Sequence, residues 1–337
     1  MGSKLISLKE GIEMFNTHMS ILKNGSSPGI ITPFVNLNKA MMNGIPKNTV
    51  CCIAGHSGGG KTSLLNSIIM DAPVLNDNLV VLVFTLEMPV RSLVARHVSN
   101  NQNIPIKDLY LNADKIEIDQ EMLKASESLP IYYIEYTGTA NNVYEDIDSF
   151  CNQYGKGKDV LVCLDHALLI AGDDDKKISQ LSARLNDLKK KYNTTITEDG
   201  KPSTCLTTII LSQLNDAMLT TERISKKIRM FPGYTDIYQG RQLFHICDII
   251  IALNNPYKYI EKVHKGDDRD REYNGYPLYH KNNKNQLIPI VYAHIIKGRD
   301  SGESVQLFAN FLHVNKLIPL KFKDETVNNV YLTEKYE

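Results

Sequence analysis

The chain has 337 residues, of which 38 are basic, 38 are acidic and 42% are hydrophobic. A charged fraction of 23% is ordinary for a folded protein and excludes wholesale disorder. The net charge of zero excludes a generally polycationic nucleic-acid binder, although it is compatible with a local basic lining around a channel. The length suffices for one large α/β domain, alone or with a small appendage.

No apolar run approaches the length of a membrane span, and the mixed N-terminal segment does not resemble a signal peptide. The six cysteines contain no C-x-x-C pair, and four of them lie in or beside apolar runs, where a thiol behaves as a small hydrophobe. We therefore expect a reduced, cytoplasmic protein without a membrane partner or a zinc site.

Residues 5–23 have a helical pattern, and a Gly- and Pro-containing break at 25–29 predicts a linker after them. Apolar runs typical of strands then alternate with helical segments. The predicted strands are 50–54, 79–85, 131–135, 160–164, 206–211, 246–253, 288–296 and 304–311. The predicted helices are 64–70, 90–100, 143–154 and 178–192. This order predicts an α/β fold with a mostly parallel sheet, helices on both faces and a closing C-terminal β-hairpin made of the last two strands.

Two polar stretches, 193–203 and 256–285, interrupt this alternation. We interpret both as solvated surface loops, and the second as an insertion between two strands.

Residues 55–62 match the phosphate-binding pattern G-x-x-x-x-G-K-[ST] without a mismatch, after a strand and before a helix. Glycines allow backbone N–H groups to surround phosphate oxygens at a helix N-terminus. Lys61 brings a charge to the β- and γ-phosphates, and Thr62 offers a hydroxyl to Mg²⁺. The predicted nucleotide-binding residues are Gly55, His56, Ser57, Gly58, Gly59, Gly60, Lys61, Thr62 and Ser63.

The same segment contains a G-x-S-x-G pattern centred on Ser57, which is typical of a serine-hydrolase elbow. Such hydrolases place several strands before the elbow, whereas here it follows the first clear strand. No HGGG-like oxyanion segment precedes it, and Lys61 and Thr62 would have no role. The hydrolase remains a minor alternative.

Three polar residues follow the ends of predicted strands, at the edge where parallel sheets bind ligands. Asp165 stands in the position of a Mg²⁺-holding acid, Glu87 brings a second carboxylate, and Gln213 is placed to sense a γ-phosphate. Phosphoryl transfer to water needs both a metal ligand and a group that polarises the water. These residues and the phosphate loop together predict a site that hydrolyses ATP with Mg²⁺.

From residue 29 to residue 311 the sequence resembles the C-terminal RecA-type motor domain of DnaB-like replicative helicases. The F-T-L-E-M segment at 84–88 is close to the family's F-S-L-E-M, and S-Q-L-N at 212–215 matches its S-Q-L-N. Weaker similarities lie at 29–37, 93–96, 165–169, 247–250 and 295–302.

The resemblance implies a RecA-like P-loop NTPase that acts as an ATP-dependent helicase in DNA replication. Such a motor is a ring, usually a hexamer, which translocates on single-stranded DNA and unwinds the duplex. Glu87 would be the catalytic base, Asp165 would hold Mg²⁺, and Gln213 would couple the nucleotide to the DNA loops. Lys297 and Arg299 would reach into the neighbouring subunit's ATP site as trans-acting cations.

The implied organisation is a linker helix and linker at 1–28, a RecA-like ATPase domain at 29–320 with an insertion at about 256–285, and a C-terminal tail at 321–337. The linker helix would dock on the adjacent protomer. Because about 28 residues precede Gly29, we do not expect the family's separate N-terminal domain, through which primase is commonly engaged. Primase and a helicase loader are the partners that the family suggests. A short form of this kind would suit a bacteriophage replisome in the host cytoplasm.

A basic segment at 223–229 is our candidate for DNA contact. It holds Arg223, Lys226, Lys227 and Arg229, which are four cations in seven residues. A solvated helix face is the alternative interpretation. Two other functions also stay open: a RecA-like recombination or repair ATPase, and a nucleotide-gated DNA clamp without unwinding activity.

Overall fold

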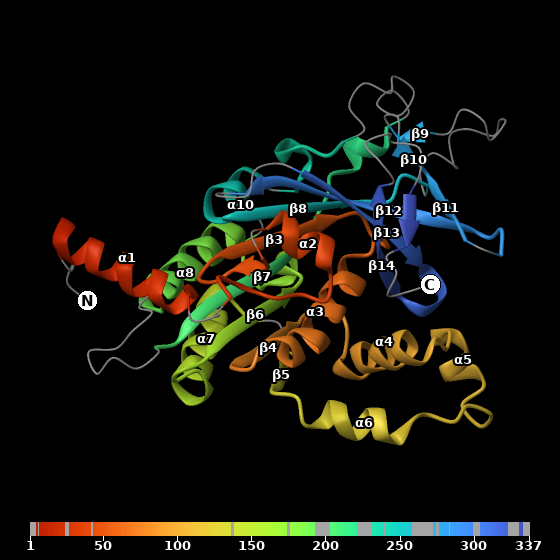
Figure 1. Ribbon diagram of the computed structural model, residues 1–337, viewed down its shortest axis with the longest axis horizontal. Coiled ribbons are helices and arrows are strands. Elements are labelled where there is room, and N and C mark those ends of the chain that lie inside the picture. The colour runs from red at the N-terminus through yellow and green to blue at the C-terminus, as the bar shows by residue number, and fades with distance from the viewer. Residues whose placement is uncertain are drawn as a thin grey trace.

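The computed structural model describes residues 5, 7–23, 27–41, 43–135, 138–173, 176–192, 203–220, 231–238, 240–257, 272–273, 276–282, 284–298, 304–322 and 330–332. An 11-stranded sheet forms the centre of the molecule, and helices lie on both of its faces (Figure 1). No helix within the described ranges is long and apolar enough to cross a bilayer.

One half of the sheet is parallel, with the strand order β8-β3-β7-β6-β4-β5. These strands are β3 (Val50–Gly55), β4 (Leu79–Thr85), β5 (Ile131–Ile134), β6 (Asp159–Asp165), β7 (Cys205–Gln213) and β8 (Ile249–Asn254). Nearly all residues of β3, β4 and β8 are buried, because helices cover a parallel sheet on both faces. The predicted α/β fold with a mostly parallel sheet is confirmed.

Alternate residues of the parallel strands face two different helical layers. Cys51 and Ile53 pack with α2 (Val35–Ala40) and α3 (Lys61–Leu75). On the opposite face, Cys52 and Ala54 pack with α7 (Ala140–Tyr154), α8 (Lys177–Lys191) and α10 (Gly240–Ile246). All six cysteines are buried with free thiols, as small hydrophobic residues would be.

The other half of the sheet is antiparallel and follows β8. It consists of β11 (Tyr279–Lys281), β12 (Leu287–Gly298), β13 (Ser304–Phe311), β14 (Lys316–Phe322) and β15 (Val330–Leu332). The pairing of β12 with β13 confirms the predicted hairpin. The strands β14 and β15 were not predicted, and they extend the sheet into the segment 321–337 that was assigned to a tail.

The remaining elements are short or lie outside the sheet. The helices are α1 (Leu8–Lys23), α4 (Val90–Gln102), α5 (Ile106–Leu111) and α6 (Gln120–Glu127). The 3-10 turns are η1 (Ala167–Leu169), η2 (Asp216–Leu219), η3 (Tyr234–Asp236) and η5 (Leu312–Val314). Two small hairpins pair β1 (Gly29–Ile30) with β2 (Ile45–Pro46) and β9 (Glu272–Tyr273) with β10 (Tyr276–Pro277).

Some predicted boundaries were wrong. Residue 246 ends α10 and does not start a strand, because Cys247 and Asp248 separate that helix from β8. The helices α5 and α6 were missed, since neither buries any residue and so neither has a clear apolar stripe. The predicted loop at 256–285 contains β9, β10 and β11, whereas 193–202 and 258–271 lie outside the described residues.

One buried carboxylate joins three elements at the start of β8. Asp248 is 2% exposed and accepts hydrogen bonds from the backbone N–H of Val50 at 2.9 Å and from the ammonium of Lys189 at 2.6 Å. Val50 begins β3 and Lys189 lies on α8. The carboxylate therefore holds the central strand, its neighbour and a covering helix in register.

Replacing Asp248 with alanine should lower the free energy of unfolding by about 3–5 kcal/mol, because it leaves the partner ammonium without its counter-charge. Urea denaturation followed by circular dichroism measures this change. The matched control is Asp187→Ala, which removes an exposed pair with Arg184 at 3.6 Å and should cost less than about 0.5 kcal/mol. Equal losses in the two variants would contradict the role given to Asp248.

Candidate nucleotide-binding site

The loop between β3 and α3 takes its shape from its glycines. Gly58 and Gly60 have φ angles of 64° and 98°, a region that disfavours residues with a Cβ atom. A Cβ atom on Gly59 would lie 2.9 Å from the carbonyl oxygen of His56. All three glycines are needed for the loop to curl at the N-terminus of α3, where backbone N–H groups attract anions.

Lys61 begins α3 and is 8% exposed. Its ammonium donates hydrogen bonds to the carbonyl oxygens of Gly55 at 2.7 Å and of His56 at 3.0 Å. A Cβ atom on Gly55 would lie 3.0 Å from Cγ of Lys61, so the glycine leaves room for the lysine stem. The charge of Lys61 is thus held inside the loop, at the position where phosphate oxygens would bind.

Asp165 ends β6 beside the end of β4, where it pairs in register with Thr85. It is 4% exposed. Burial, followed by the neighbouring Glu87 carboxylate, raises the pKa of Asp165 to about 6. Lys61 and a hydrogen bond with the Thr62 side chain oppose this rise. The structure therefore brings together the two residues that the sequence predicted as Mg²⁺ ligands.

Glu87 lies just beyond the end of β4, and its side chain is 53% exposed. Its Oε2 atom is 3.7 Å from Nε2 of His166, a residue next to Asp165. Burial lowers the pKa of His166, so the imidazole is neutral at pH 7. The contact therefore joins a carboxylate to a neutral ring and is not an ion pair.

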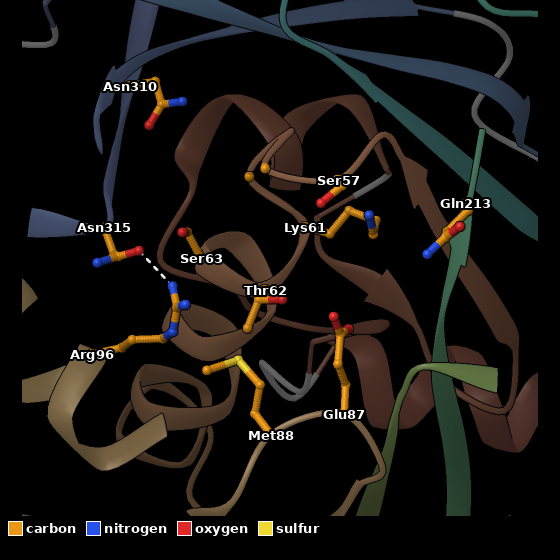
Figure 2. Close-up of a pocket in the computed structure, with 12 residues that line it drawn as sticks. Ser57, Lys61, Thr62, Ser63, Glu87, Met88, Arg96, Gln213, Asn310 and Asn315 are labelled. Carbon is orange, nitrogen blue, oxygen red and sulfur yellow. Dashed lines mark hydrogen bonds between the residues drawn. The ribbon is translucent and has the colours of Figure 1, made fainter. Parts of the chain in front are cut away.

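These side chains open into one pocket with a volume of about 320 Å³. Figure 2 shows Ser57, Lys61 and Thr62 of the phosphate loop facing Glu87, with Gln213 beyond them at the end of β7. Phosphate-binding groups, a candidate base and a candidate sensor thus share a single cavity.

The donor set fits a Mg²⁺–nucleotide. Mg²⁺ prefers hard oxygen ligands and keeps several waters. Thr62 supplies a hydroxyl and Asp165 a carboxylate, and the Oδ1 atom of Asp165 is buried without a hydrogen-bond partner among the described residues. A carboxylate oxygen in that condition suits a ligand cation.

Comparisons with known proteins agree with this geometry. A model of the DnaB-like helicase C-terminal domain matches residues 29–272. The chain belongs to the DnaB-like helicase family. Family members are ATP-hydrolysing helicases of the P-loop class, so this DnaB-like protein is an ATP-dependent helicase of the replicative type. Membership also removes the serine-hydrolase alternative, because Ser57 lies in the phosphate loop.

Two solved structures are similar to the DnaB-like chain. One is the ATPase domain of a phage helicase, with a TM-score of 0.72, 19% identity, and coverage of 94% of this chain and 100% of that one. The other is described as a DnaB-like replicative helicase and its interactions with primase, with a TM-score of 0.67, 18% identity, and coverage of 97% of this chain and 68% of that one. At these identities the likeness shows the shared RecA-like fold. No curated protein matched the sequence.

Three groups of predicted residues do not join the pocket of this DnaB-like chain. Lys297, on β12, does not line it: its ammonium donates to the carbonyl oxygen of Phe244 and lies 4.4 Å from the centre of that ring. Arg299 and the basic segment at 223–229 lie outside the described residues. Their proposed contacts with a neighbouring subunit and with DNA stay predictions.

Four residues that line the pocket were not predicted as site residues. They are Met88, Arg96, Asn310 and Asn315. Met88 and Arg96 follow Glu87 closely and stand within the segments that resemble the family, so proximity to the base was the available signal. The two asparagines come from the C-terminal strands, and no local pattern marks them.

Mg²⁺ binding to this DnaB-like helicase should weaken as the pH falls through about 6. Asp165 must lose a proton to hold the ion, and its raised pKa of about 6 lets protons compete below that pH. With ADP present, we expect the apparent dissociation constant for Mg²⁺ to rise about tenfold from pH 7 to pH 5. Titration calorimetry measures this constant.

The control for this pH series is Asp165→Asn, which keeps the titration of the nucleotide phosphates and lacks the carboxyl group. Its Mg²⁺ binding should be weaker throughout but less dependent on pH. Identical pH dependence in the two proteins would show that Asp165 does not titrate in this range.

Proposed function

We propose that this DnaB-like helicase uses Mg²⁺ and ATP to translocate as a ring on single-stranded DNA and to unwind duplex DNA during replication. The observation that carries the proposal is the convergence of the phosphate loop, Asp165, Glu87 and Gln213 on one edge of the sheet. This arrangement has a defined place for the phosphates, the metal, the water and a sensor of hydrolysis.

In the proposed reaction, Lys61 and the backbone N–H groups of the loop bind the β- and γ-phosphates. Thr62 and Asp165 would hold Mg²⁺, which when bound neutralises charge on the phosphates. Glu87 orients a water toward the γ-phosphate and accepts its proton, since its exposed carboxylate faces the cavity.

Gln213 is proposed to pass the state of the γ-phosphate to the DNA-binding loops. Its backbone carbonyl accepts a hydrogen bond from Tyr238 at 2.8 Å, and Asn215 donates from its N–H to the carbonyl of Asp236 at 2.6 Å. The end of β7 is therefore tied to η3, the first described turn after the basic segment at 223–229. A shift of Gln213 toward the nucleotide would be felt on both sides of that segment.

Assembly of the ring is proposed to use α1 of segment 1–28, which extends from one end of the molecule (Figure 1). Leu8, Ile12 and Phe15 recur at helical spacing and are exposed. An exposed apolar stripe of this kind would pack on the ATPase domain (29–320) of the adjacent protomer. Lys297 and Arg299 would then act across the same interface.

A replicative motor of this type would work in the cytoplasm, which is the host's if the protein is of bacteriophage origin. Primase and a helicase loader are its candidate partners. The primase interaction is described for one of the two similar structures. Co-sedimentation of the assembled ring with the primase of the same replication system tests this part of the proposal.

The function is tested by measuring ATP hydrolysis with and without single-stranded DNA, on protein sized by light scattering in the same buffer. Stimulation by DNA in a ring-sized particle, followed by strand separation of a forked substrate, is the expected result. Filaments that hydrolyse ATP without separating strands would favour a recombination ATPase. ATP-dependent retention of DNA without strand separation would favour a clamp.

Replacing Glu87 with glutamine should lower kcat for ATP hydrolysis by about 10²–10⁴-fold, because an amide keeps the shape of the side chain but cannot accept the proton. ATP binding, measured by calorimetry, should change little. The control is Glu127→Gln on the exposed surface of α6, which should leave kcat at the wild-type value. A wild-type rate in Glu87→Gln would show that another group is the base.

The double variant Ile12→Asp/Phe15→Asp should prevent ring assembly, because two charges on the apolar stripe of α1 would have to be buried between protomers. The melting temperature of the monomer should stay the same, since both side chains are already exposed. Light scattering and thermal melting measure the two effects. Glu13→Ala, an exposed position on another face of α1, is the control. Rings formed equally well by the double variant would exclude this interface.

A further inference from the structure

The two ends of the pocket differ in chemistry. Glu87 and Gln213 lie at one end (Figure 2). Arg96, Asn310 and Asn315 lie at the other. In the proposed function, water attacks the γ-phosphate beside Glu87. The nucleoside at the opposite end of the substrate must therefore extend toward the two asparagines.

This second end is built by the C-terminal strands. Asn310 lies on β13, and Asn315 lies in the turn between η5 and β14. The strand β14 rests on the phosphate loop, because a methyl carbon of Leu317 is 3.7 Å from the place where a Cβ atom on Gly60 would stand. The connection from β13 to β14 thus forms a wall beside the bound phosphates.

Asn310 has an incomplete set of hydrogen bonds. It lines the pocket and is 4% exposed, and its Nδ2 group has no hydrogen-bond partner among the described residues. Buried amide groups are almost always paired, so an unpaired one at a substrate pocket indicates a ligand that completes it. An amide both donates and accepts, which suits the edge of a purine or a ribose hydroxyl better than a phosphate, which only accepts.

Asn315 holds the guanidinium group of Arg96. Its Oδ1 atom accepts a hydrogen bond from Nη1 of Arg96 at 2.5 Å. Asn315 adopts a φ angle of 51°, a conformation that asparagine tolerates better than most residues. The bond fixes one edge of a planar, weakly hydrated cation at the pocket wall, and such a group stacks well on a flat aromatic ring.

We propose that Asn310 binds the nucleoside of the nucleotide and that Asn315 is a positioning residue, which holds Arg96 against that nucleoside. This inference rests on the proposed ATP hydrolysis and names the part of the substrate that the C-terminal wall recognises. The affinity for ATP then comes in part from the nucleoside and not from the triphosphate alone.

Calorimetric titration of the full chain with Mg²⁺ compares ATP with inorganic tripolyphosphate, which lacks a nucleoside. Wild-type protein should bind ATP at least about tenfold more tightly. Asn310→Ala should weaken ATP binding about tenfold and leave tripolyphosphate binding within about twofold. Asn152→Ala, on the exposed surface of α7, should change neither.

Equal wild-type affinity for ATP and tripolyphosphate would overturn the inference, as would an equal loss of both ligands in Asn310→Ala. The wild-type comparison stands even if the variant fails to fold. An absence of ATP hydrolysis in wild-type protein would instead reject the proposed function, and the preference for ATP over tripolyphosphate would still report on the wall.

Two analogues distinguish the ribose from the base. If the effect of Asn310→Ala disappears with 2′-deoxyATP, the amide binds the 2′-hydroxyl. If it disappears with purine riboside triphosphate, which lacks the 6-amino group, the amide binds the base edge. Either result supports the inference.

The positioning role has its own test. Asn315→Gly removes the side chain and keeps the positive φ angle, so it should raise KM for ATP about threefold with kcat within about twofold. Asn315→Asp should restore KM, because a carboxylate also accepts from Arg96. Failure of the aspartate to restore KM, or an equal loss in kcat, would show that Asn315 acts on the fold and not on the substrate.

Discussion

The position of β3 in the sheet governs where chemistry can take place. This strand is buried over its whole length and pairs in parallel with β7 on one side and β8 on the other. Its loop can therefore open only at the carboxyl edge of the sheet, where α3 begins and contributes the positive end of its dipole. The other reacting groups follow from this geometry, because Asp165, Glu87 and Gln213 each lie at or just beyond the end of a parallel strand.

Charge in the pocket is balanced for a bound cation. One buried ammonium, Lys61, faces two carboxylates, and the raised pKa of Asp165 records the cost of ionising a buried acid beside Glu87. A divalent ion between the carboxylates and the phosphates removes that cost. The same burial that disfavours the free carboxylate thus increases what the ion gains by binding, and the phosphate loop supplies the remaining positive field.

Much of this organisation could be predicted from the sequence, because it depends on local patterns. The strands at 79–85 and 304–311 have the predicted bounds, and the glycine loop is specified by residues adjacent in the chain. The pocket wall could not be predicted, because it depends on packing between distant segments. Asn315 is 219 residues from its partner Arg96, and nothing in the sequence around it indicates that β14 covers the phosphate loop.

The contact between β14 and the phosphate loop also sets an order on synthesis. The family match ends at residue 272, yet the wall comes from strands that follow it. On the ribosome, the loop and the parallel sheet emerge first and can fold around a phosphate before β13 and β14 exist. The nucleoside end of the pocket forms only when the last strands are released. A nascent or prematurely ended chain would therefore present a phosphate site that cannot distinguish a nucleotide from a simple polyphosphate.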